Sequence, residues 1–444
     1  MLPPGPKTGL FTRHSLIFLR KKGPLNFFQE VVRDYGDIAF FKFGPEKVCF
    51  INHPDLIKDV LVTNNKNFTK GRGLERVKLM LGEGLLTSEG EFHMRQRRLI
   101  QPAFHRDRVA GYARVMVNHG LSLRDQWQEG ATVNIAEEMM RLTLGIVAET
   151  LFAVDITSDV QSIGKKLTVV MESFPLMMLP FAKFLIHLPI PAIRRRMAAR
   201  HELDRLILGM IRERRISGED RGDLLSMLLA AQDTEGDGMG MSDQQVRDEA
   251  MTIFLAGHET TANALAWTWY LLAQHPEVEA LMIAELDSVL GDGSPGMEHL
   301  PRLTFTEKVV TESMRLYPPA WMVGRRAINE YDIRGYQLPK RTIVIMSQYV
   351  MHRNAEYFPE PDKFDPDRWT PAFKAGLPKY AYFPFGGGPR QCIGEGFAWA
   401  EAILLVATLA QKWKIKMVPG QTIVPQPLVT LRPKGGIQMT LHRR

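Results

Sequence analysis

The segment FPFGGGPRQCIG, residues 383–394, is the most informative part of the sequence, and it leads into an apolar run with the spacing of a helix. Its one cysteine, Cys392, lies just before that predicted helix. Three consecutive glycines let the backbone turn tightly and bring N–H groups close to the sulfur, and the positive end of the helix points toward it. Both effects favour a thiolate over a thiol.

A thiolate held in this way is suited to be an axial ligand of haem iron. Phe385 is available to pack on a flat ring, Arg390 to meet an anionic group, and Gly394 to let the helix approach the macrocycle. An isolated cysteine near the start of a helix is more often a small buried hydrophobe. The haem interpretation therefore depends on the residues around Cys392.

The segment FGGGPRQCIG resembles the haem-ligand loop of the cytochrome P-450 superfamily, and two further segments resemble other motifs of that family. AGHETT, residues 256–261, is similar to the family's oxygen-activation motif and lies in a long apolar helix predicted over Ser242–His275. Ser242 and Gln245 form a capping-box pattern at its start. ESMR, residues 312–315, and FDPDRW, residues 364–369, resemble the segments of the family's Glu-Arg-Arg network.

The resemblance gives the oxygen-activation motif a chemical role. A glycine inside an apolar helix costs about 1 kcal/mol relative to alanine, so Gly257, beside Ala256, calls for a packing or functional reason. Room beside an iron-bound ligand is such a reason. The hydroxyl of Thr260 can bond a guest instead of its own helix, and Glu259 can relay protons that promote O–O cleavage. Without the resemblance, Glu259 and Thr260 would be interpreted as ordinary polar side chains at a solvated kink of the helix.

Basic side chains are candidates for holding the haem propionates. By resemblance they are His93, Arg97, Arg325 and Arg390, with Arg326 competing with Arg325. Many relatives carry tryptophan where His93 stands, although histidine can also donate to a carboxylate. The remaining haem contacts implied by the resemblance are Phe385, Gly386, Gly394, Ala256 and Gly257. Because the chain has no Cys-x-x-Cys-His attachment site, we expect haem b that is not covalently linked.

Glu312, Arg315 and Arg368 have a structural rather than a catalytic role in the resemblance. Glu312 and Arg315 are three residues apart, a spacing that permits an ion pair on one helix face. Most such pairs are surface pairs worth a few tenths of a kcal/mol. In this family they are expected to lock the proximal core as a buried charge network with Arg368.

Composition and strand patterns favour a helix-rich globular protein with small sheets. The 444 residues are 45% hydrophobic and 24% charged, which excludes disorder, collagen and coiled coil. Runs rich in β-formers predict strands at Ile38–Phe43, Lys47–Ile51, Tyr336–Leu338, Thr342–Gln348, Val429–Leu431 and Ile437–Leu441, the last two as a C-terminal hairpin. Because these strands need one another, we predict one mainly α, α+β domain over residues 1–444, with β-rich parts at 36–52, 325–350 and 417–444. The resemblance implies a triangular helical prism whose long central helix lies over the haem.

The substrate site implied by the resemblance is mostly apolar. Its expected lining is Phe254, Leu255, Ala256, Thr260, Ala320, Trp321, Met322, Val429 and Thr430. A loop at residues 71–87 and the methionine-containing run at 174–181 are expected to form the access route, although such side chains also fit a protein core. Only Arg72 and Arg76 offer a charged anchor, so a lipophilic substrate such as a fatty acid, terpenoid or steroid is favoured.

The function implied by the resemblance is that of a haem-thiolate monooxygenase, which inserts one oxygen atom of O2 into an organic substrate. A peroxide-driven peroxygenase of the same fold is an alternative, although peroxygenases typically lack the acid–alcohol pair. A non-catalytic haem sensor is another. No reductase sequence follows Arg444, so we expect electrons from a separate acidic ferredoxin or flavodoxin with its reductase. A basic patch for that partner would contain Lys379, Arg390, Lys412 and Lys414.

Charge and cysteine content bear on the location of the protein. The net charge of +7 is moderately basic and does not by itself indicate nucleic acid as a partner. Two cysteines cannot build a disulfide framework or a four-cysteine metal site, which favours a reducing compartment. The N-terminal part offers no apolar run of roughly 18 residues that could span a bilayer, and we expect no signal peptide. We therefore expect a cytoplasmic monomer without a transmembrane anchor.

Overall fold

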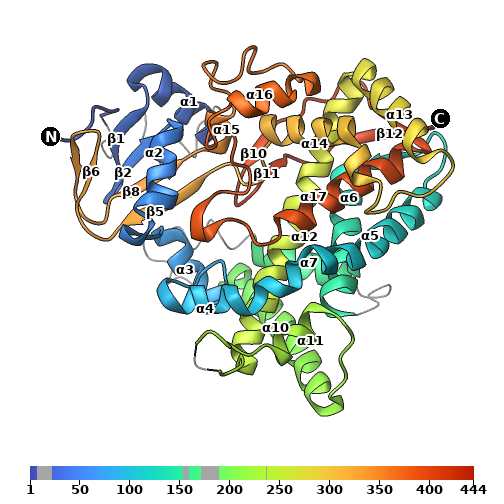
Figure 1. The fold of residues 1–444 in the computed structure, drawn as a ribbon, viewed down its shortest axis with the longest axis horizontal. Coiled ribbons are helices and arrows are strands. Elements are labelled where there is room, and N and C mark those ends of the chain that lie inside the picture. Colours follow the sequence, from blue (N-terminus) through green and yellow to red (C-terminus); the bar gives the residue numbers. More distant parts are fainter. Residues whose placement is uncertain (8–22, 154–159, 172–189, 237) are drawn as a thin grey trace. The chain divides into compact units, whose positions relative to one another are not determined.

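The computed structural model describes residues 1–7, 23–153, 160–171, 190–236 and 238–444 (Figure 1). The chain divides into two compact units, and each is assembled from separate stretches of sequence. Unit 1 comprises Met1–Arg72, Thr311–Cys392 and Pro425–Arg432, and unit 2 comprises Gly73–Val310, Ile393–Val424 and Pro433–Arg444. Helices predominate and the strands form small sheets, which confirms the predicted fold class. The expectation of one domain over residues 1–444 stays a prediction.

Unit 1 is organised around a five-stranded sheet with the order β1-β2-β8-β5-β3. Its strands are β1 (Ile38–Phe43), β2 (Glu46–Ile51), β8 (Ile343–Met346), β5 (Val323–Ala327) and β3 (Phe68–Lys70). β1 and β2 form the predicted hairpin, and β2 pairs in parallel with β8 from Val48 opposite Ile343 to Ile51 opposite Met346. Of the strands predicted to need one another, those at Ile38–Phe43, Lys47–Ile51 and Thr342–Gln348 therefore share one sheet, whereas Tyr336–Leu338 and the C-terminal strands lie in other sheets.

The other elements of unit 1 are short, apart from one helix that packs on the sheet. They are α1 (Gly23–Tyr35), α2 (Pro54–Lys58), η2 (Asp59–Thr63), η3 (Asn65–Asn67), α15 (Gln348–Met351), η6 (Pro366–Arg368), α16 (Pro371–Gly376), η7 (Gly388–Arg390) and the pairs β6 (Tyr331–Ile333) with β7 (Tyr336–Leu338) and β10 (Pro425–Pro427) with β11 (Leu431–Pro433). Phe28 of α1 stacks on Phe50 of β2 with ring centroids 4.8 Å apart. This aromatic contact anchors α1 to the sheet.

Unit 2 is helical, with one three-stranded sheet. Its elements are α3 (Arg72–Leu81), α4 (Gly90–Ile100), η4 (Gln101–Phe104), α5 (Arg106–Gln126), α6 (Ile135–Phe152), α7 (Val160–Met171), α10 (Pro191–Ser217), α11 (Leu224–Ala230), α12 (Asp243–Gln274), α13 (Pro276–Leu290), η5 (Leu300–Arg302), α17 (Glu395–Ala410) and the strands β4 (Thr132–Asn134), β12 (Gln438–Arg443) and β9 (Trp413–Met417). α14 (Thr304–Leu316) begins in unit 2 and ends in unit 1.

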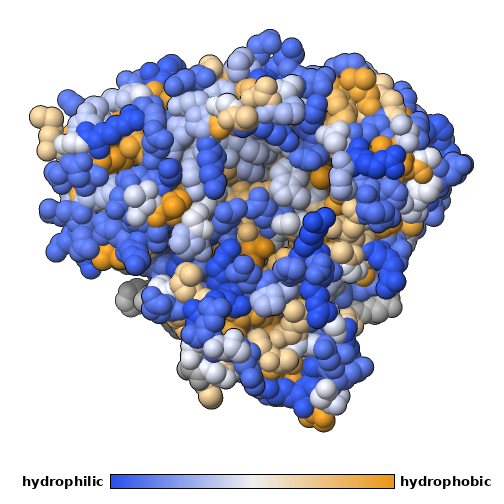
Figure 2. All heavy atoms as spheres, viewed as in Figure 1, coloured by the Kyte–Doolittle hydropathy of each residue, from blue (hydrophilic) through white to orange (hydrophobic). Residues whose placement is uncertain are grey.

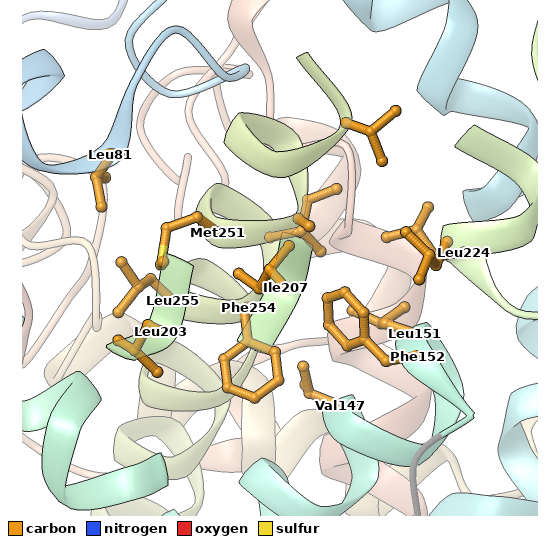
Figure 3. Close-up of a cluster of buried hydrophobic side chains, with 14 of the residues drawn as sticks. Leu81, Val147, Leu151, Phe152, Leu203, Ile207, Leu224, Met251, Phe254 and Leu255 are labelled. Carbon is orange, nitrogen blue, oxygen red and sulfur yellow. The ribbon is translucent and has the colours of Figure 1, made fainter. Parts of the chain in front are cut away.

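α12 is the predicted long helix, and its start is fixed by the predicted capping box. The N–H of Gln245 donates to Ser242 Oγ at 3.3 Å, and the N–H of Ser242 donates to Gln245 Oε1 at 2.8 Å. Most α12 side chains are buried, as expected for a central helix. Figure 3 shows its Met251, Phe254 and Leu255 in a hydrophobic cluster with side chains from other helices of unit 2.

The predicted C-terminal hairpin is wrong. Leu431 belongs to β11, which pairs with β10, and its N–H donates to the carbonyl of Pro319 within unit 1. The last strand, β12, instead pairs with β4 and β9 of unit 2. The N–H of Ile437 donates to Asn134 Oδ1, and Met439 is buried, so local turn chemistry at residues 433–436 was overridden by tertiary packing.

The access loop expected at residues 71–87 is partly helical. Residues 72–81 form α3, because Val77, Met80 and Leu81 make an apolar stripe at helical spacing that is buried in the core of unit 2. The run expected at 174–181 lies outside the described residues. The loop that follows α3 is tied to α12, since the N–H groups of Glu83 and Leu85 donate to carboxylates of that helix.

The surface is mainly hydrophilic on the face shown in Figure 2, with orange hydrophobic patches between blue side chains. Individual exposed apolar residues include Ile216 and Met239 in unit 2 and Ile328 in unit 1. Within the described ranges, none of the helices combines the length and the apolar character that crossing a membrane requires.

Candidate functional site

The cysteine loop of unit 1 is a tightly bonded turn. The N–H of Gly386 donates to the carbonyl of Phe383, and the N–H of Cys392 donates to the carbonyl of Phe385, each at 3.0 Å. Gly388 has a φ of 68°, and a Cβ built there would collide with the carbonyl oxygen of Leu61. A residue with a side chain is therefore excluded at this position by both strain and contact.

The two cysteines of the chain have opposite surroundings. Cys49 lies in β2, is completely buried, and burial raises the pKa of its thiol to about 12. Cys392 is exposed in the loop and lies three residues before the start of α17. Of the two cysteines, Cys392 is therefore the exposed candidate for a ligand role, and Cys49 is a structural residue.

Glu312, Arg315 and Arg368 form the predicted network within unit 1. Arg315 donates from Nε and Nη2 to the two oxygens of Glu312, each at 2.8 Å, and Arg368 Nε lies 3.3 Å from Glu312 Oε1. Trp369 Nε1, which sequence analysis did not single out, donates to Glu312 Oε2 at 2.9 Å. Glu312 and Arg315 are completely buried. The carboxylate is therefore paired and hydrogen-bonded on both oxygens, as a buried charge requires.

Arg315 also donates hydrogen bonds to three backbone carbonyls of the segment that follows α15. Its Nη1 donates to the carbonyls of His352 and Pro361 at 2.8 and 2.6 Å, and its Nη2 donates to that of Lys363 at 2.9 Å. The network thus fixes the segment that runs from α15 toward the cysteine loop. His352 at the start of this segment is the second residue that the sequence did not indicate.

The motif AGHETT lies in α12, and one of its residues is exposed although the stretch around it is largely buried. Residues 251–255 before it are buried, Ala256 is exposed, and Gly257 and Thr260 are half-buried. Because Ala256 and Thr260 are four residues apart, they lie on one helix face. Thr260 Oγ1 donates to the carbonyl of Ala256 at 2.7 Å. A flat group placed against this exposed position would therefore meet Ala256 and the hydroxyl of Thr260.

Gly257 has a packing role in this structure. A Cβ at this position would lie 3.1 Å from Val147 Cγ2 of α6, so the glycine permits α12 and α6 to approach closely. A glycine at this position therefore has two explanations. One is the expected room beside an iron-bound ligand, and the other is the close packing of α12 on α6, which the sequence alone does not reveal. The adjacent Glu259 is 6% exposed, and Thr143 of α6 donates from Oγ1 to the carbonyl of His258 at 2.9 Å.

The four propionate candidates are divided between the units. His93 and Arg97 lie on α4 in unit 2, where His93 is buried with Nδ1 3.2 Å from Ser88 Oγ. Arg325 on β5 and Arg390 in η7 belong to unit 1, and both are half-buried. The neighbouring Arg98 of α4 is not a candidate, because its guanidinium pairs with the carboxylate of Asp233.

The expected pocket residues are in different environments. Phe254 and Leu255 are buried in the cluster of Figure 3, where Phe254 packs on Phe152 with ring centroids 5.3 Å apart. Trp321 is also buried and donates from Nε1 to the carbonyl of Leu428 at 3.0 Å. The other members are Ala320, which is half-buried, Thr430, which is buried, and Met322 and Val429, which are exposed. Arg76 is half-buried on α3.

The basic patch expected for a redox partner carries less charge than its residue types suggest. Lys412 Nζ lies 2.8 Å from Asp125 Oδ1, so its charge is compensated. Lys379 and Lys414 are exposed, and Arg390 is half-buried. Lys379 and Arg390 belong to unit 1, and the two other lysines to unit 2.

Comparisons with known proteins agree with this description. The sequence model of the family described as Cytochrome P450 matches residues 3–441. Cyclooctatin synthase of Streptomyces melanosporofaciens is 41% identical over 94% of this chain and 91% of its own. Cyclooctat-9-en-7-ol 5-monooxygenase of the same organism is 38% identical over 92% and 88%. The crystal structure of the cytochrome P450DA heme domain matches with a TM-score of 0.89 and 27% identity, covering 100% of this chain and 98% of that one.

Proposed function

Because the chain belongs to the cytochrome P450 family and is a haem-thiolate monooxygenase, we propose that its substrate is a cyclic terpenoid. The observation that supports this substrate class is the similarity to two Streptomyces enzymes, one of them named as a monooxygenase of a cyclic unsaturated alcohol. The expected pocket residues are consistent with it, since they are mostly apolar and only Thr260 and Thr430 among them carry hydroxyl groups. A lipophilic ring system with few polar groups suits such a lining.

We propose Cys392 as the thiolate ligand of haem b. Two observations, each made within one unit, support this cofactor: Cys392 is exposed in a loop whose backbone bonds are internal, and Ala256 is exposed in a stretch of α12 that is otherwise largely buried. When bound, haem supplies the activation of O2 and the transfer of one oxygen atom to the substrate. His93, Arg97, Arg325 and Arg390 are proposed to hold its propionates, because a cation or imidazole N–H pairs with a carboxylate.

We propose that Thr260 and Glu259 deliver protons during the reaction. Thr260 Oγ1 donates to the carbonyl of Ala256, so its lone pairs can accept a hydrogen bond from a group placed beside the exposed Ala256. Rotation about χ1 would turn the same hydroxyl from its helix toward that group. Glu259 is nearly buried next to it, and a carboxyl in that position can hold a proton and pass it on.

We also propose that an acidic ferredoxin or flavodoxin, with its reductase, supplies the electrons to a cytoplasmic monomer. The exposed Lys379 and Lys414 support an acidic partner, and the two-cysteine composition supports a reducing compartment. If the partner is steered by charge, raising the ionic strength should slow reduction of the enzyme steeply. A flat salt profile contradicts the charge-steered partner. Sedimentation velocity tests the monomer.

The substrate class is tested by titrating the purified haem protein with candidate ligands and recording the change of spin state in the Soret region. Cyclic terpene hydrocarbons and alcohols are expected to shift the band and to give hydroxylated products with NADPH, a ferredoxin and its reductase. Linear fatty acids of similar carbon number are the comparison set. Equal or better turnover of the fatty acids would contradict the terpenoid assignment and leave the monooxygenase unaffected.

A further inference from the structure

His352 links the charge network of unit 1 to the cysteine loop. It follows α15 and is completely buried. Its backbone carbonyl accepts a hydrogen bond from Arg315 Nη1 at 2.8 Å. Its ring nitrogen Nε2 lies 3.0 Å from the backbone nitrogen of Phe383, the first residue of the loop. One residue therefore contacts the network through its main chain and the loop through its side chain.

The bond to Phe383 controls the start of a short series of loop hydrogen bonds. The carbonyl of Phe383 accepts from the N–H of Gly386, and the carbonyl of Phe385 accepts from the N–H of Cys392. The direction in which the loop leaves Phe383 thus sets where Phe385 lies, and Phe385 in turn restrains Cys392. Within the part of the chain that the structure describes, the side chain that accepts from the Phe383 amide is that of His352.

The ring of His352 is held in one orientation and one tautomer. Tyr382 and Phe383 pack on it with ring centroids 4.9 and 5.6 Å away. Because a backbone N–H can only donate, Nε2 must be the unprotonated acceptor and the ring proton must be on Nδ1. Burial, followed by the positive charges of Arg315 and Arg353, holds the pKa of His352 well below its usual range. The imidazole is therefore neutral near pH 7, as this bond requires.

We propose that His352 is a positioning residue for thiolate ligation: it fixes the amide of Phe383, and through the loop it holds Cys392 where the sulfur is presented to the iron. This inference rests on the proposed role of Cys392 as the haem ligand. The described contacts of His352 are with the network and the loop, so its proposed role is to position the loop and not to take part in the reaction. The requirement is for an acceptor atom at the position of Nε2, and not for an imidazole as such.

Three substitutions test the requirement for that acceptor. In His352→Gln the amide oxygen can reach the position of Nε2, in His352→Asn the amide is one carbon too short, and His352→Leu has no acceptor. All three keep the backbone carbonyl that Arg315 binds. Hydrogen exchange of the loop peptide containing Phe383 is compared with that of a reference peptide around α16, using the haem-loaded proteins. The fraction of the reduced, CO-bound protein that keeps the thiolate-type Soret band is followed during mild heating.

We expect the amide of Phe383 to exchange about 10-fold to 100-fold faster in the Asn and Leu variants, because a buried donor loses its partner. The reference peptide should be unchanged, the thiolate band should be lost faster in the same two variants, and the Gln variant should behave like the wild type. Equal behaviour of all three variants, or a matching rise in the reference peptide, would overturn the inference. A wild type without the thiolate band would refute Cys392 as the haem ligand. The hydrogen-exchange rates would still test whether His352 holds the amide of Phe383.

Discussion

Replacing Glu312 by alanine is expected to prevent stable haem binding, because the carboxylate compensates two buried cations. Five hydrogen bonds reach it, two from Arg315 and one each from Arg368, Trp369 Nε1 and the N–H of Asp365. The variant leaves Arg315, which is 0% exposed, without a counter-charge. Removing one partner of a buried ion pair costs about 3–5 kcal/mol. That loss is a large part of a total stability of about 5–15 kcal/mol.

The assay is the molar ratio of haem to purified protein together with the midpoint of urea unfolding. Glu312→Ala should be recovered largely as apoprotein with a lower midpoint. Glu312→Gln keeps the shape of the side chain but turns its amide hydrogens toward the surrounding donors. We therefore expect an intermediate loss of haem content and of stability. Glu298→Ala, at a side chain that is 73% exposed, is the control and should change stability by no more than about 0.5 kcal/mol. Wild-type haem content and midpoint in Glu312→Ala would refute this reasoning.

Three further predictions concern other parts of the chain. In Thr260→Ala, electrons from NADPH should be diverted from product to hydrogen peroxide. Thr268→Ala, which removes a similar hydrogen bond from a buried threonine of α12, should not have this effect. Full coupling of NADPH consumption to product in Thr260→Ala would contradict the proton-delivery role. Gly388→Ala should lower haem content, because its Cβ meets the carbonyl of Leu61 at a φ of 68°, and Gly396→Ala, with open space around it, should not; equal haem content would contradict this. Burial raises the pKa of Glu401 from 4.5 to about 8, so the folded state retains a proton that the unfolded state loses, and stability falls as pH rises between these values. Glu401→Gln should therefore stabilise the protein by up to about 5 kcal/mol at pH 8 and little near pH 4, by urea unfolding; the same gain at both pH values would contradict the assignment.

Local chemistry explains which elements the sequence predicted well. The capping box of Ser242 and Gln245 and the apolar pattern of α12 are properties of neighbouring residues, and the helix begins and ends within one residue of its predicted limits. β1 and the strand Tyr336–Leu338 were predicted with their observed bounds. The ion pair of Glu312 with Arg315 is a spacing on one helix and was predictable for the same reason.

Tertiary contacts explain what the sequence could not supply. Turn residues at 433–436 suggested a hairpin, but the partners of β12 lie at residues 132–134 and 413–417. Gly257 was assigned to the space beside an iron ligand, and its contact with Val147 depends on the packing of α6. His352 and Trp369 acquire their roles only when residues far apart in the chain are brought together. No pattern of neighbouring residues encodes such contacts.

Ligation of haem iron by Cys392 is tested by the carbon monoxide difference spectrum of the dithionite-reduced protein, recorded for the wild type, Cys392→Ala and Cys49→Ala. A thiolate ligand from Cys392 predicts the long-wavelength Soret band typical of the family in the wild type and in Cys49→Ala, and its absence in Cys392→Ala. Persistence of that band in Cys392→Ala, or a wild type that binds haem and shows only the shorter-wavelength band of a haem without thiolate, would contradict the proposed site.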